Sequence, residues 1–399
     1  MRILQMHNHH SGPGGAMEVL AQEAILLTDA GHSVEQYTLP AAEKMGLSPL
    51  RAGFKAVWNV QASRDLAAMI KAFQPDVVHV HTPFPLLSPA IFRTASGQNT
   101  PIITTLHSYR YSCIAATCHR DGHVCEDCIG KRLKYPGLIH RCYHDSVGAS
   151  AALTLSLGLH RQINTFSQHV TRFLALTDFS RRLLIRDGIP SEKVTVKPNF
   201  VPDPGVVKPP RSAEPYVAFI GRFIDIKGIK TLLKAWPQVR SGALRLKIAG
   251  DGELRPMVEE QARNDPSIEV LGWLDEAAVT DLMAGAQCVC VPSEWYEGQP
   301  LVILRSLSVG TPVLVSSLEN LSTEVLEDDA GAMFEVGDDV SLARALEQLM
   351  RNLARTPLRD RARASYERRY SPAVNLEMLE AIYREAAFIQ HAGPTEEKV

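Results

Sequence analysis

The stretch Gln287-Cys-Val-Cys-Val-Pro-Ser-Glu-Trp-Tyr-Glu-Gly-Gln-Pro-Leu-Val-Ile-Leu-Arg305 carries the features that decide the fold. Its opening apolar run predicts a short buried strand, and the residues from Pro300 predict a helix, because proline suits the first helical position. The polar turn between them holds Glu294 and Glu297. We therefore expect both carboxylates at the carboxyl end of a strand, where open α/β sheets bind phosphates and sugars.

Strand-like and helical segments alternate along the whole chain, which predicts an α/β protein with doubly wound parallel sheets. The predicted strands cover residues 2–7, 34–39, 75–81, 101–106, 172–176, 216–220, 244–249, 269–271, 288–291 and 312–315. The predicted helices cover residues 17–30, 63–73, 148–167, 180–187, 341–352 and 373–387. A proline-rich segment at 198–215 predicts a linker, and 399 residues are enough for two cores. We therefore expect an N-terminal domain over 1–200 and a second domain over 201–372.

Composition narrows the class of protein. The N-terminus resembles a strand more than a signal peptide, and no apolar run approaches the roughly 20 residues that span a bilayer. These features favour a cytoplasmic location. Residues 1–200 carry 20 Lys and Arg against 14 Asp and Glu, which suits an anionic acceptor or a membrane surface but also fits chance clustering. No basic stripe with interleaved aromatic residues supports a nucleic-acid partner.

A second strand–loop–helix motif is Gly221-Arg-Phe-Ile-Asp-Ile-Lys-Gly228. A bidentate guanidinium and a flexible ammonium, from Arg222 and Lys227, suit a diphosphate. The flanking glycines allow the backbone to approach a ligand closely. The alternative is that both side chains are ordinary solvated cations, and the strand–loop–helix context favours phosphate binding.

The turn at Glu297 resembles the donor site of glycosyltransferase family 4, whose motif is Glu, seven residues, Glu. In this sequence Arg305 stands at the second position. The resemblance covers almost the whole chain and implies the GT-B fold: two Rossmann-like domains facing a cleft, with a C-terminal helix, here about 373–390, that packs on the N-terminal domain. It also implies retaining transfer of a sugar from a nucleotide-diphosphate sugar, with UDP favoured over GDP as the nucleotide.

The resemblance assigns roles to matching residues of the second domain. Glu297 would contact the transferred sugar, while Arg222 and Lys227 would bind the donor phosphates without a catalytic metal. Residues of the turns beside them complete the predicted donor site: Glu294, Gly298 and Gln299 in the Glu297 turn, and Gly252 in the sequence Ala249-Gly-Asp-Gly252. Gly252 also fits a tight turn without a ligand. Trp273 fits either a contact to the base or the core.

In the first domain the resemblance singles out two positions. The glycine-rich loop His9–Gly15 would face the acceptor and the donor phosphate, with Gly15 as the binding residue. His107, directly after a predicted strand, would approach the hydroxyls of the donor sugar and is assigned with Glu297 to catalysis. As a dinucleotide motif the loop fails, because Met17 occupies the third glycine position. His79 and His81 alternate along a buried strand and are predicted core residues.

Arg305 leaves three interpretations open. It contacts the nucleotide in another way, or it marks a weakened or donor-shifted enzyme, or it is an engineered change. A carboxylate accepts hydrogens from ribose hydroxyls, whereas a guanidinium only donates. Arg305 therefore cannot take over the role of glutamate directly.

An insert over about 108–146 contains five of the seven cysteines. Cys125-Glu-Asp-Cys128 has zinc-knuckle spacing, and Cys113 and Cys142 would complete a structural zinc site. The pattern resembles an insert of some bacterial family members, in which Cys118 would be extra. Disulfides, free structural cysteines and an iron–sulfur cluster are the alternatives.

The function we expect is a retaining glycosyltransferase that acts on a saccharide or lipid-linked acceptor. A nucleotide-sugar epimerase is one alternative, and it would turn over donor without an acceptor. A non-catalytic or impaired sugar-nucleotide-binding protein is the other, because of Arg305. The uncharged segment Val147–Leu159 follows several cations, which suggests peripheral contact with a membrane or, alternatively, a core helix.

Overall fold

The computed structural model describes residues 1–9, 14–205, 207, 214–239, 243–353 and 355–392. Most of the predicted glycine-rich loop and part of the predicted linker lie outside these residues. The chain forms two compact units. Unit 1 comprises Met1–Arg120, Cys125–Asn199 and Asn375–Val399, and unit 2 comprises Asp121–Val124 and Phe200–Val374.

Unit 1 is built on a six-stranded sheet in the order β2-β1-β3-β4-β7-β8, and all neighbouring strands are parallel. In that order the strands are Ser33–Leu39, Arg2–Asn8, Val77–Thr82, Ile102–Thr105, Arg172–Ala175 and Val194–Val196. The inner strands β1, β3, β4 and β7 are almost entirely buried, as expected for a sheet that helices cover on both faces, whereas the edge strand β2 has no buried residue. The chain therefore forms the parallel sheet that the sequence predicts for this half.

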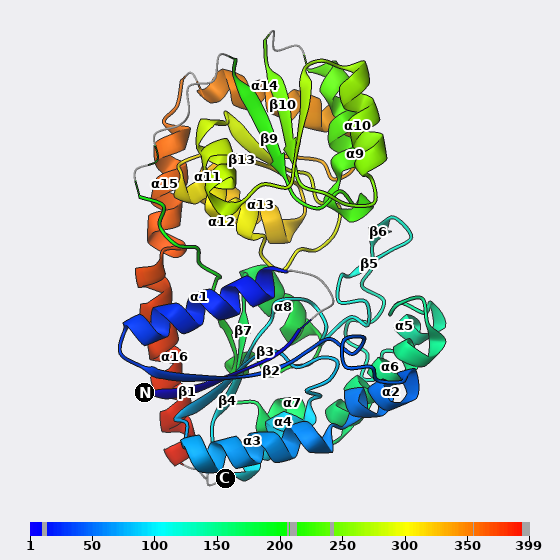
Figure 1. Ribbon diagram of the computed structural model, residues 1–399, viewed down its shortest axis with the longest axis vertical. Coiled ribbons are helices and arrows are strands. Elements are labelled where there is room, and N and C mark those ends of the chain that lie inside the picture. Colours follow the sequence, from blue (N-terminus) through cyan, green and yellow to red (C-terminus); the bar gives the residue numbers. More distant parts are fainter. Residues whose placement is uncertain (10–13, 206, 208–213, 240–242, 354, 393–399) are drawn as a thin grey trace. The chain divides into compact units, whose positions relative to one another are not determined.

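The helices of unit 1 connect these strands (Figure 1). They are α1 (Gly15–Asp29), α2 (Pro49–Val57), α3 (Val60–Phe73), α4 (Ala90–Gly97), α5 (Tyr135–Ile139), α6 (Val147–Gln162), α7 (Thr165–His169) and α8 (Asp178–Arg186). A two-residue pair of strands, β5 (His119–Arg120) and β6 (His123–Val124), lies in the cysteine-rich insert. The single helix predicted over 148–167 is wrong: α6 ends before Asn164, whose left-handed φ of 56° interrupts the helix before α7.

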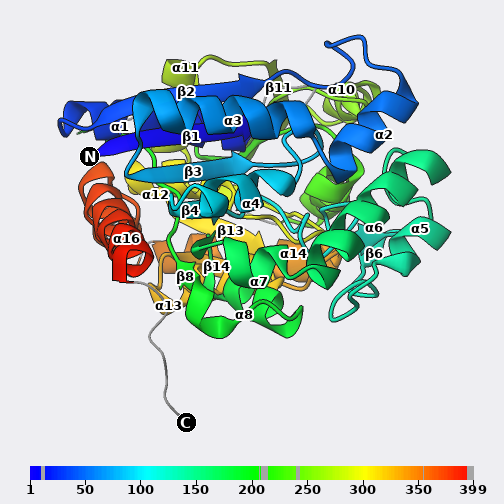
Figure 2. The ribbon, with the colours of Figure 1, turned by 90° about the horizontal axis from the view of Figure 1, so that it is seen from below.

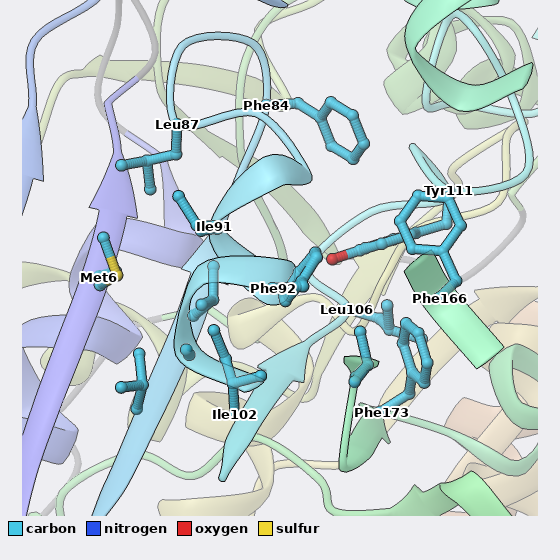
Figure 3. Packing of buried hydrophobic residues seen from close by; sticks show 14 of the residues in the cluster. Met6, Phe84, Leu87, Ile91, Phe92, Ile102, Leu106, Tyr111, Phe166 and Phe173 are labelled. Carbon is cyan, nitrogen blue, oxygen red and sulfur yellow. The ribbon is translucent and has the colours of Figure 1, made fainter. Parts of the chain in front are cut away.

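Alternate residues of the strands enter different clusters of buried side chains. Met6 of β1 belongs to the larger cluster, which extends across the sheet to Ile91, Ile102 and Phe173 (Figure 3). Ile3 packs instead in a second cluster that includes residues of the last helix. Both sheet faces are therefore buried, which fixes the register of β1, since a slip by one residue would exchange the two sets.

The last helix, α16 (Pro372–Ala392), belongs to unit 1 from Asn375 onward. Its buried side chains Leu379, Ile382 and Tyr383 pack against Ile3 and Val77. Figure 2 shows α16 beside the start of β1. The end of the chain thus completes the core of the unit that the first residues begin.

Unit 2 contains a second parallel sheet, in the order β11-β10-β9-β12-β13-β14. Its strands in that order are Ile268–Gly272, Arg245–Ala249, Tyr216–Ile220, Cys288–Val291, Val313–Ser316 and Gly331–Phe334. Its helices are α9 (Ile229–Ala235), α10 (Arg255–Asn264), α11 (Glu276–Gly285), α12 (Leu301–Ser308), α13 (Glu319–Glu327), α14 (Asp339–Leu353) and α15 (Leu358–Arg369), with short 3₁₀ turns at Asp225–Lys227 and Trp236–Gln238. This strand order reverses between β9 and β12, which is where doubly wound sheets bind ligands.

Candidate functional site

The reversal point of unit 2 lies between the loops that follow β9 and β12. The loop after β9 is Gly221–Gly228, and the loop after β12 is Pro292–Pro300. Helix α12 begins at Leu301, and Pro300 is its N-cap, with an extended ψ of 121°. Pro300 is thus one residue ahead of its predicted place, and the turn with both glutamates still leads directly into the helix.

These two loops are in backbone contact. The N–H of Glu294 donates to the carbonyl of Ile226 over 2.9 Å. Gly228 has a φ of +69°, and a Cβ placed there would lie 1.7 Å from the carbonyl oxygen of Pro292. No side chain fits that space, so glycine at 228 is what allows the loops to meet.

Lys227 and Glu297 form an ion pair across the two loops. Nζ of Lys227 lies 2.5 Å from Oε1 of Glu297, which also accepts a hydrogen bond of 2.8 Å from Oγ of Ser293. Asn320 holds the backbone of the same turn by donating to the carbonyl of Glu297 over 2.7 Å. Nζ of Lys227 also lies 5.6 Å from the centre of the Trp295 ring. Hydrogen bonds within the turn therefore orient the carboxylate of Glu297, and the ion pair holds the ammonium of Lys227 beside it.

Glu294, the second carboxylate of the turn, has a different environment. Its Oε1 accepts a hydrogen bond of 2.5 Å from Oγ1 of Thr231 on α9. This bond, like the Lys227–Glu297 pair, links the segment after β9 to the segment after β12. Glu294 thus supports the loop geometry and stays partly exposed.

The loop after β10 packs beneath the β9 loop. The N–H of Phe223 donates to the carbonyl of Asp251 over 2.8 Å. At Gly252, with a φ of +155°, a Cβ would lie 2.6 Å from the carbonyl oxygen of Phe223. Close packing of the two loops is therefore enough to explain a glycine at position 252, without a direct contact to a ligand.

Arg222 projects from this packed loop as an exposed side chain. Within the described parts of the chain, its guanidinium makes no ion pair. It lies five positions before Lys227, in the same loop, so the reversal point of unit 2 offers two cations.

The rest of the predicted donor site has contacts within the protein. Gln299 is nearly buried and donates from Nε2 to Oε2 of Glu324 over 3.2 Å, and Gly298 lies beside it in the turn. Burial raises the pKa of Glu324, although Tyr370 donates to the same oxygen over 2.6 Å. Gln299 therefore helps to hold the turn from below.

Arg305 lies in the last turn of α12 and pairs with a carboxylate of the neighbouring helix. Its Nη2 is 3.5 Å from Oε1 of Glu276, the first residue of α11. Glu276 is largely exposed, and sequence analysis did not single it out, because nothing local connects it to Arg305. Trp273 lies on the surface with 74 % of its side chain exposed, so the core interpretation of that residue is wrong.

In unit 1, His107 follows β4 and is linked to a buried cluster. Its Nε2 is 3.0 Å from Nδ1 of His81, and burial lowers its pKa well below the usual value, with His81 adding to the shift. His79 and His81 are buried as predicted. Gly15 is the exposed first residue of α1. Two buried residues beside this cluster were missed: Glu23 on α1, which lies next to His81, and Lys197 after β8, which pairs with Glu23 from 174 residues away in the sequence.

The four predicted zinc ligands, Cys113, Cys125, Cys128 and Cys142, line one pocket together with His119. Cys118 lies against Cys113, and a hydrogen bond from its thiol lowers the pKa of Cys113 to about 6. None of the seven cysteines forms a disulfide. Among the described residues, however, only Glu23, His79 and His81 place three ligand atoms within 4.8 Å of one another. The thiols thus surround a common space without closing into a tetrahedron.

Comparison with known proteins places this architecture in a family. The model for "Glycosyltransferase Family 4" matches residues 13–203, and the model for "Glycosyl transferases group 1" matches residues 214–352. The chain belongs to glycosyltransferase family 4. It therefore shares the catalytic class of that family, as the motif at Glu297 predicted.

Individual proteins agree with this assignment. The phosphatidyl-myo-inositol mannosyltransferase of Mycolicibacterium smegmatis is 25% identical over 386 residues, which cover 91% of this chain and 86% of that protein. The protein of the same name from Mycobacterium leprae is 28% identical over 267 residues, covering 63% and 68%. The structure of Anabaena HepE in complex with UDP superposes with a TM-score of 0.65 at 16% identity, covering 96% of this chain and all of that one. This family 4 glycosyltransferase therefore has the GT-B fold.

Among the described residues of this glycosyltransferase, no helix combines the length and apolar character needed to cross a bilayer. Several of the exposed apolar residues of unit 1 lie on three of its helices. They include Leu50 and Phe54 of α2, Tyr135 and Ile139 of α5, and Val147 and Leu155 of α6.

Proposed function

We propose that this glycosyltransferase moves a hexosyl group from a nucleotide-diphosphate sugar, with UDP favoured over GDP, to a hydroxyl of a saccharide or lipid-linked acceptor. The observation that carries the proposal is the Lys227–Glu297 pair at the reversal point of unit 2, with exposed Arg222 in the same loop. It brings a carboxylate that suits sugar hydroxyls next to cations that suit a diphosphate.

The pair explains how one site can hold both halves of a donor. An ammonium on a flexible stem can turn from Glu297 toward a phosphate without movement of the backbone. Arg222 supplies a second, bidentate cation for the same diphosphate. Glu297 stays oriented by Ser293 and is then available to accept hydrogen bonds from the sugar. The donor phosphates thus compete with Glu297 for Lys227.

The chemistry we propose is front-face substitution with retention of configuration. The acceptor oxygen forms a bond to the anomeric carbon while the bond from that carbon to the phosphate oxygen breaks. The electron pair of the broken bond goes to the departing diphosphate, which also takes the hydroxyl proton. Arg222 and Lys227 stabilise the charge on the diphosphate, so the step needs no catalytic metal. Glu297 orients the sugar, and His107 is the second residue that we assign to the hydroxyls of the donor sugar.

Similar proteins support the substrate classes. The mannosyltransferases are named for a phosphatidyl-myo-inositol acceptor, and the Anabaena structure contains UDP. A lipid-linked acceptor and a UDP-sugar follow by analogy for this chain. Such a donor would place the reaction in the cytoplasm, at or near the membrane.

Calorimetric titration with a panel of UDP- and GDP-sugars tests the donor, and NMR of the product of a transfer assay tests the stereochemistry. We expect selective binding of one donor, transfer with retention, and unchanged activity in EDTA. Turnover of donor without an acceptor would instead support the epimerase. Binding without any turnover would support the non-catalytic alternative.

Arg305 bears on the nucleotide half of the site. The family motif has a glutamate at this position of α12. In this chain the position is Arg305, and the carboxylate paired with it is that of Glu276 at the start of α11, which remains largely exposed. We propose that Glu276, held by Arg305, accepts the hydrogen bonds from the ribose hydroxyls. On this proposal the altered motif is an adapted contact and the donor site remains competent.

Peripheral membrane contact is supported by one face of unit 1. Helices α2 and α6 pack together, and α5 packs on α6 (Figure 1). Exposed Leu50 and Phe54 of α2 alternate with Arg51 and Lys55, an arrangement that suits an anionic bilayer surface. Sedimentation with vesicles of phosphatidylglycerol and phosphatidylcholine tests it: Phe54→Glu should reduce binding, and phosphatidylcholine alone should bind weakly.

The cysteine pocket supports a structural zinc ion held by Cys113, Cys125, Cys128 and Cys142. The ligand types fit and share one pocket, and zinc would draw the sulfurs together. Four thiolates leave no open coordination position, so the role would be to hold the insert and not to catalyse. Elemental analysis of the purified protein should find one zinc per chain, lost in Cys125→Ser. Absence of zinc from protein prepared with zinc present would refute it.

A further inference from the structure

Unit 1 contains a line of hydrogen-bonding groups that ends at His107. Glu23 of α1 is fully buried, and one of its carboxylate oxygens, Oε1, is paired with Lys197, which is also fully buried. The other oxygen, Oε2, is 3.3 Å from Nε2 of His81. Nδ1 of His81 is in turn 3.0 Å from Nε2 of His107. The line therefore runs from a carboxylate through one imidazole to a second.

The connection between Glu23 and His81 is the decisive one. Oε2 of Glu23 and Nε2 of His81 are both buried and have no hydrogen-bond partner elsewhere in the described structure. Their separation is slightly long for an aligned bond, but each is the polar atom available to the other. Buried polar atoms without a hydrogen-bond partner destabilise the fold, so we place a hydrogen bond between these two atoms.

The neighbouring His79 does not compete for this oxygen. Its Nδ1 is 2.8 Å from the hydroxyl of Tyr383, and its Nε2 is 2.7 Å from Oγ1 of Thr105. The distance from Nδ1 of His79 to Oε2 of Glu23 is 3.7 Å, beyond hydrogen-bond range. His79 is thus hydrogen-bonded to α16 and β4 and takes no part in the bonds that run from Glu23 to His107.

The charge state of the cluster fixes the direction of each bond. Burial by itself raises the pKa of Glu23, but the charge of Lys197 and a hydrogen bond from His81 hold it well below its usual value, so the carboxylate is ionised. An ionised carboxylate only accepts, so the hydrogen is on Nε2 of His81. Lys197 already balances the charge of Glu23, and a further buried cation would be uncompensated. His81 is therefore neutral, and its Nδ1 accepts.

The planes of the two rings agree with such a bond. The His81 and His107 rings are inclined by only 16°, with centroids 5.3 Å apart. This separation exceeds the 3.0 Å between the bonded nitrogens, as expected for rings that meet edge to edge. His107 thus donates from Nε2–H in the ring plane to His81, and its Nδ1 carries the lone pair.

We infer that Glu23, acting through His81, is a positioning residue that sets the tautomer of His107, so that Nδ1 of His107 presents a hydrogen-bond acceptor to a ligand hydroxyl. The identity of that hydroxyl rests on the proposed function, in which it belongs to the donor sugar. The tautomer itself does not depend on the proposed function. Which nitrogen of an imidazole carries the proton is set by the partner of the other nitrogen.

Histidine ¹⁵N chemical shifts of the full chain test the inference directly. We expect the Nε2–H tautomer at His107 at neutral pH, with its signals assigned by their loss in His107→Gln. The test variant is the double change Glu23→Gln with Lys197→Met, because it removes both charges and leaves no buried ion unpaired. The glutamine amide can donate to Nε2 of His81, which moves the hydrogen of His81 to Nδ1. His81 then donates to Nε2 of His107, and His107 becomes the Nδ1–H tautomer.

Tyr383→Phe is the matched control, because it removes a hydrogen bond of the same cluster outside the line. It should leave the His107 tautomer unchanged. In a transfer assay the double variant should lose about 10- to 100-fold in kcat/KM, as for other misoriented hydrogen-bonding groups. An Nδ1–H or cationic His107 in the unaltered protein, or a tautomer that persists in the double variant, would overturn the inference. A tautomer that switches in a chain without transferase activity would support it while refuting the proposed function.

Discussion

The two units share a doubly wound parallel sheet, yet the polar residues near the carboxyl ends of their strands have opposite environments. In unit 1, Glu23, Lys197, His79 and His81 are buried, and the carboxylate of Glu23 lies between Lys197 and His81. In unit 2, Lys227 is partly exposed and Arg222 is exposed. Charges buried inside a unit have to stay paired, because the loss of one partner leaves the other uncompensated. Cations left at the surface of a rigid loop pair remain available for an anionic ligand.

The geometry of unit 2 depends most on Gly228. Changing Gly228 to Ala forces a Cβ into the carbonyl of Pro292, so we expect a loss above about 4 kcal/mol in the free energy of unfolding, or failure of unit 2 to fold. Chemical denaturation followed by circular dichroism measures it. Gly188→Ala is the control: its φ is +90° but nothing lies within 4 Å of the new Cβ, so only about 1–2 kcal/mol of backbone strain should appear. Equal losses in the two variants would contradict the close contact of the loops.

For unit 1 the corresponding change is Glu23→Ala. It leaves Lys197 buried without a counter-charge, so we expect a loss of about 3 kcal/mol or more in the free energy of unfolding. Asp29→Ala, at an exposed position of the same helix, should change stability by less than about 0.5 kcal/mol. Addition of Lys197→Met should restore part of the loss. A Glu23→Ala chain as stable as the control would show that the buried cluster contributes little.

The two units should also differ in their response to pH. Burial lowers the pKa of His79 and of His107 well below the usual 6.5, so the folded state binds fewer protons than the unfolded state when the pH falls below about 6.5. The free energy of unfolding is therefore unaffected by these histidines above about pH 6.5. Below that pH it falls by up to about 1.4 kcal/mol per pH unit for each histidine. Unit 2 contains only one histidine, His123.

Hydrogen exchange followed by mass spectrometry between pH 7.5 and 5.5, corrected for the intrinsic rate, resolves the two units. We expect protection of the strands of unit 1 to fall with pH while that of unit 2 stays level. His79→Gln should reduce the response of unit 1 and leave the part that is due to the other buried histidines. A parallel loss in both units would contradict the assignment of the effect to buried histidines.

A smaller effect is expected at Arg305. The change Arg305→Glu places a second carboxylate next to Glu276, and like charges at this distance repel. We expect about a 10-fold loss in donor affinity by calorimetry, recovered in the charge-reversed double variant Glu276→Arg with Arg305→Glu. Tighter donor binding by Arg305→Glu alone would instead show that Arg305 weakens the site.

The sequence predicted the central strands of both sheets well, because buried parallel strands are continuous apolar runs. β9 and β12 have the bounds expected for them. The edge strand β14 was missed, since only one of its four residues is buried and its apolar signal is weak. The helix α2 was missed as well, because half of its apolar residues face solvent.

The candidate site could be predicted where a motif is local and not where it depends on distant residues. Strand–turn–helix patterns indicated Lys227 and Glu297 separately, but nothing in either motif shows that they pair across 70 positions. In the sequence, Glu23 resembles any polar residue of an amphipathic helix. Its buried partner Lys197 follows 174 residues later. Three-dimensional packing was needed to connect them.

The central claim is that the loops at the reversal point of unit 2 bind a nucleoside diphosphate. Calorimetric titration of UDP into the unaltered chain and into Lys227→Met tests it most directly, with Lys234→Met, an exposed lysine of α9, as control. We predict that Lys227→Met weakens UDP binding by about 10- to 100-fold, the contribution of one charge-assisted contact, while the control binds as the unaltered chain does. Equal affinity in all three proteins would contradict the account.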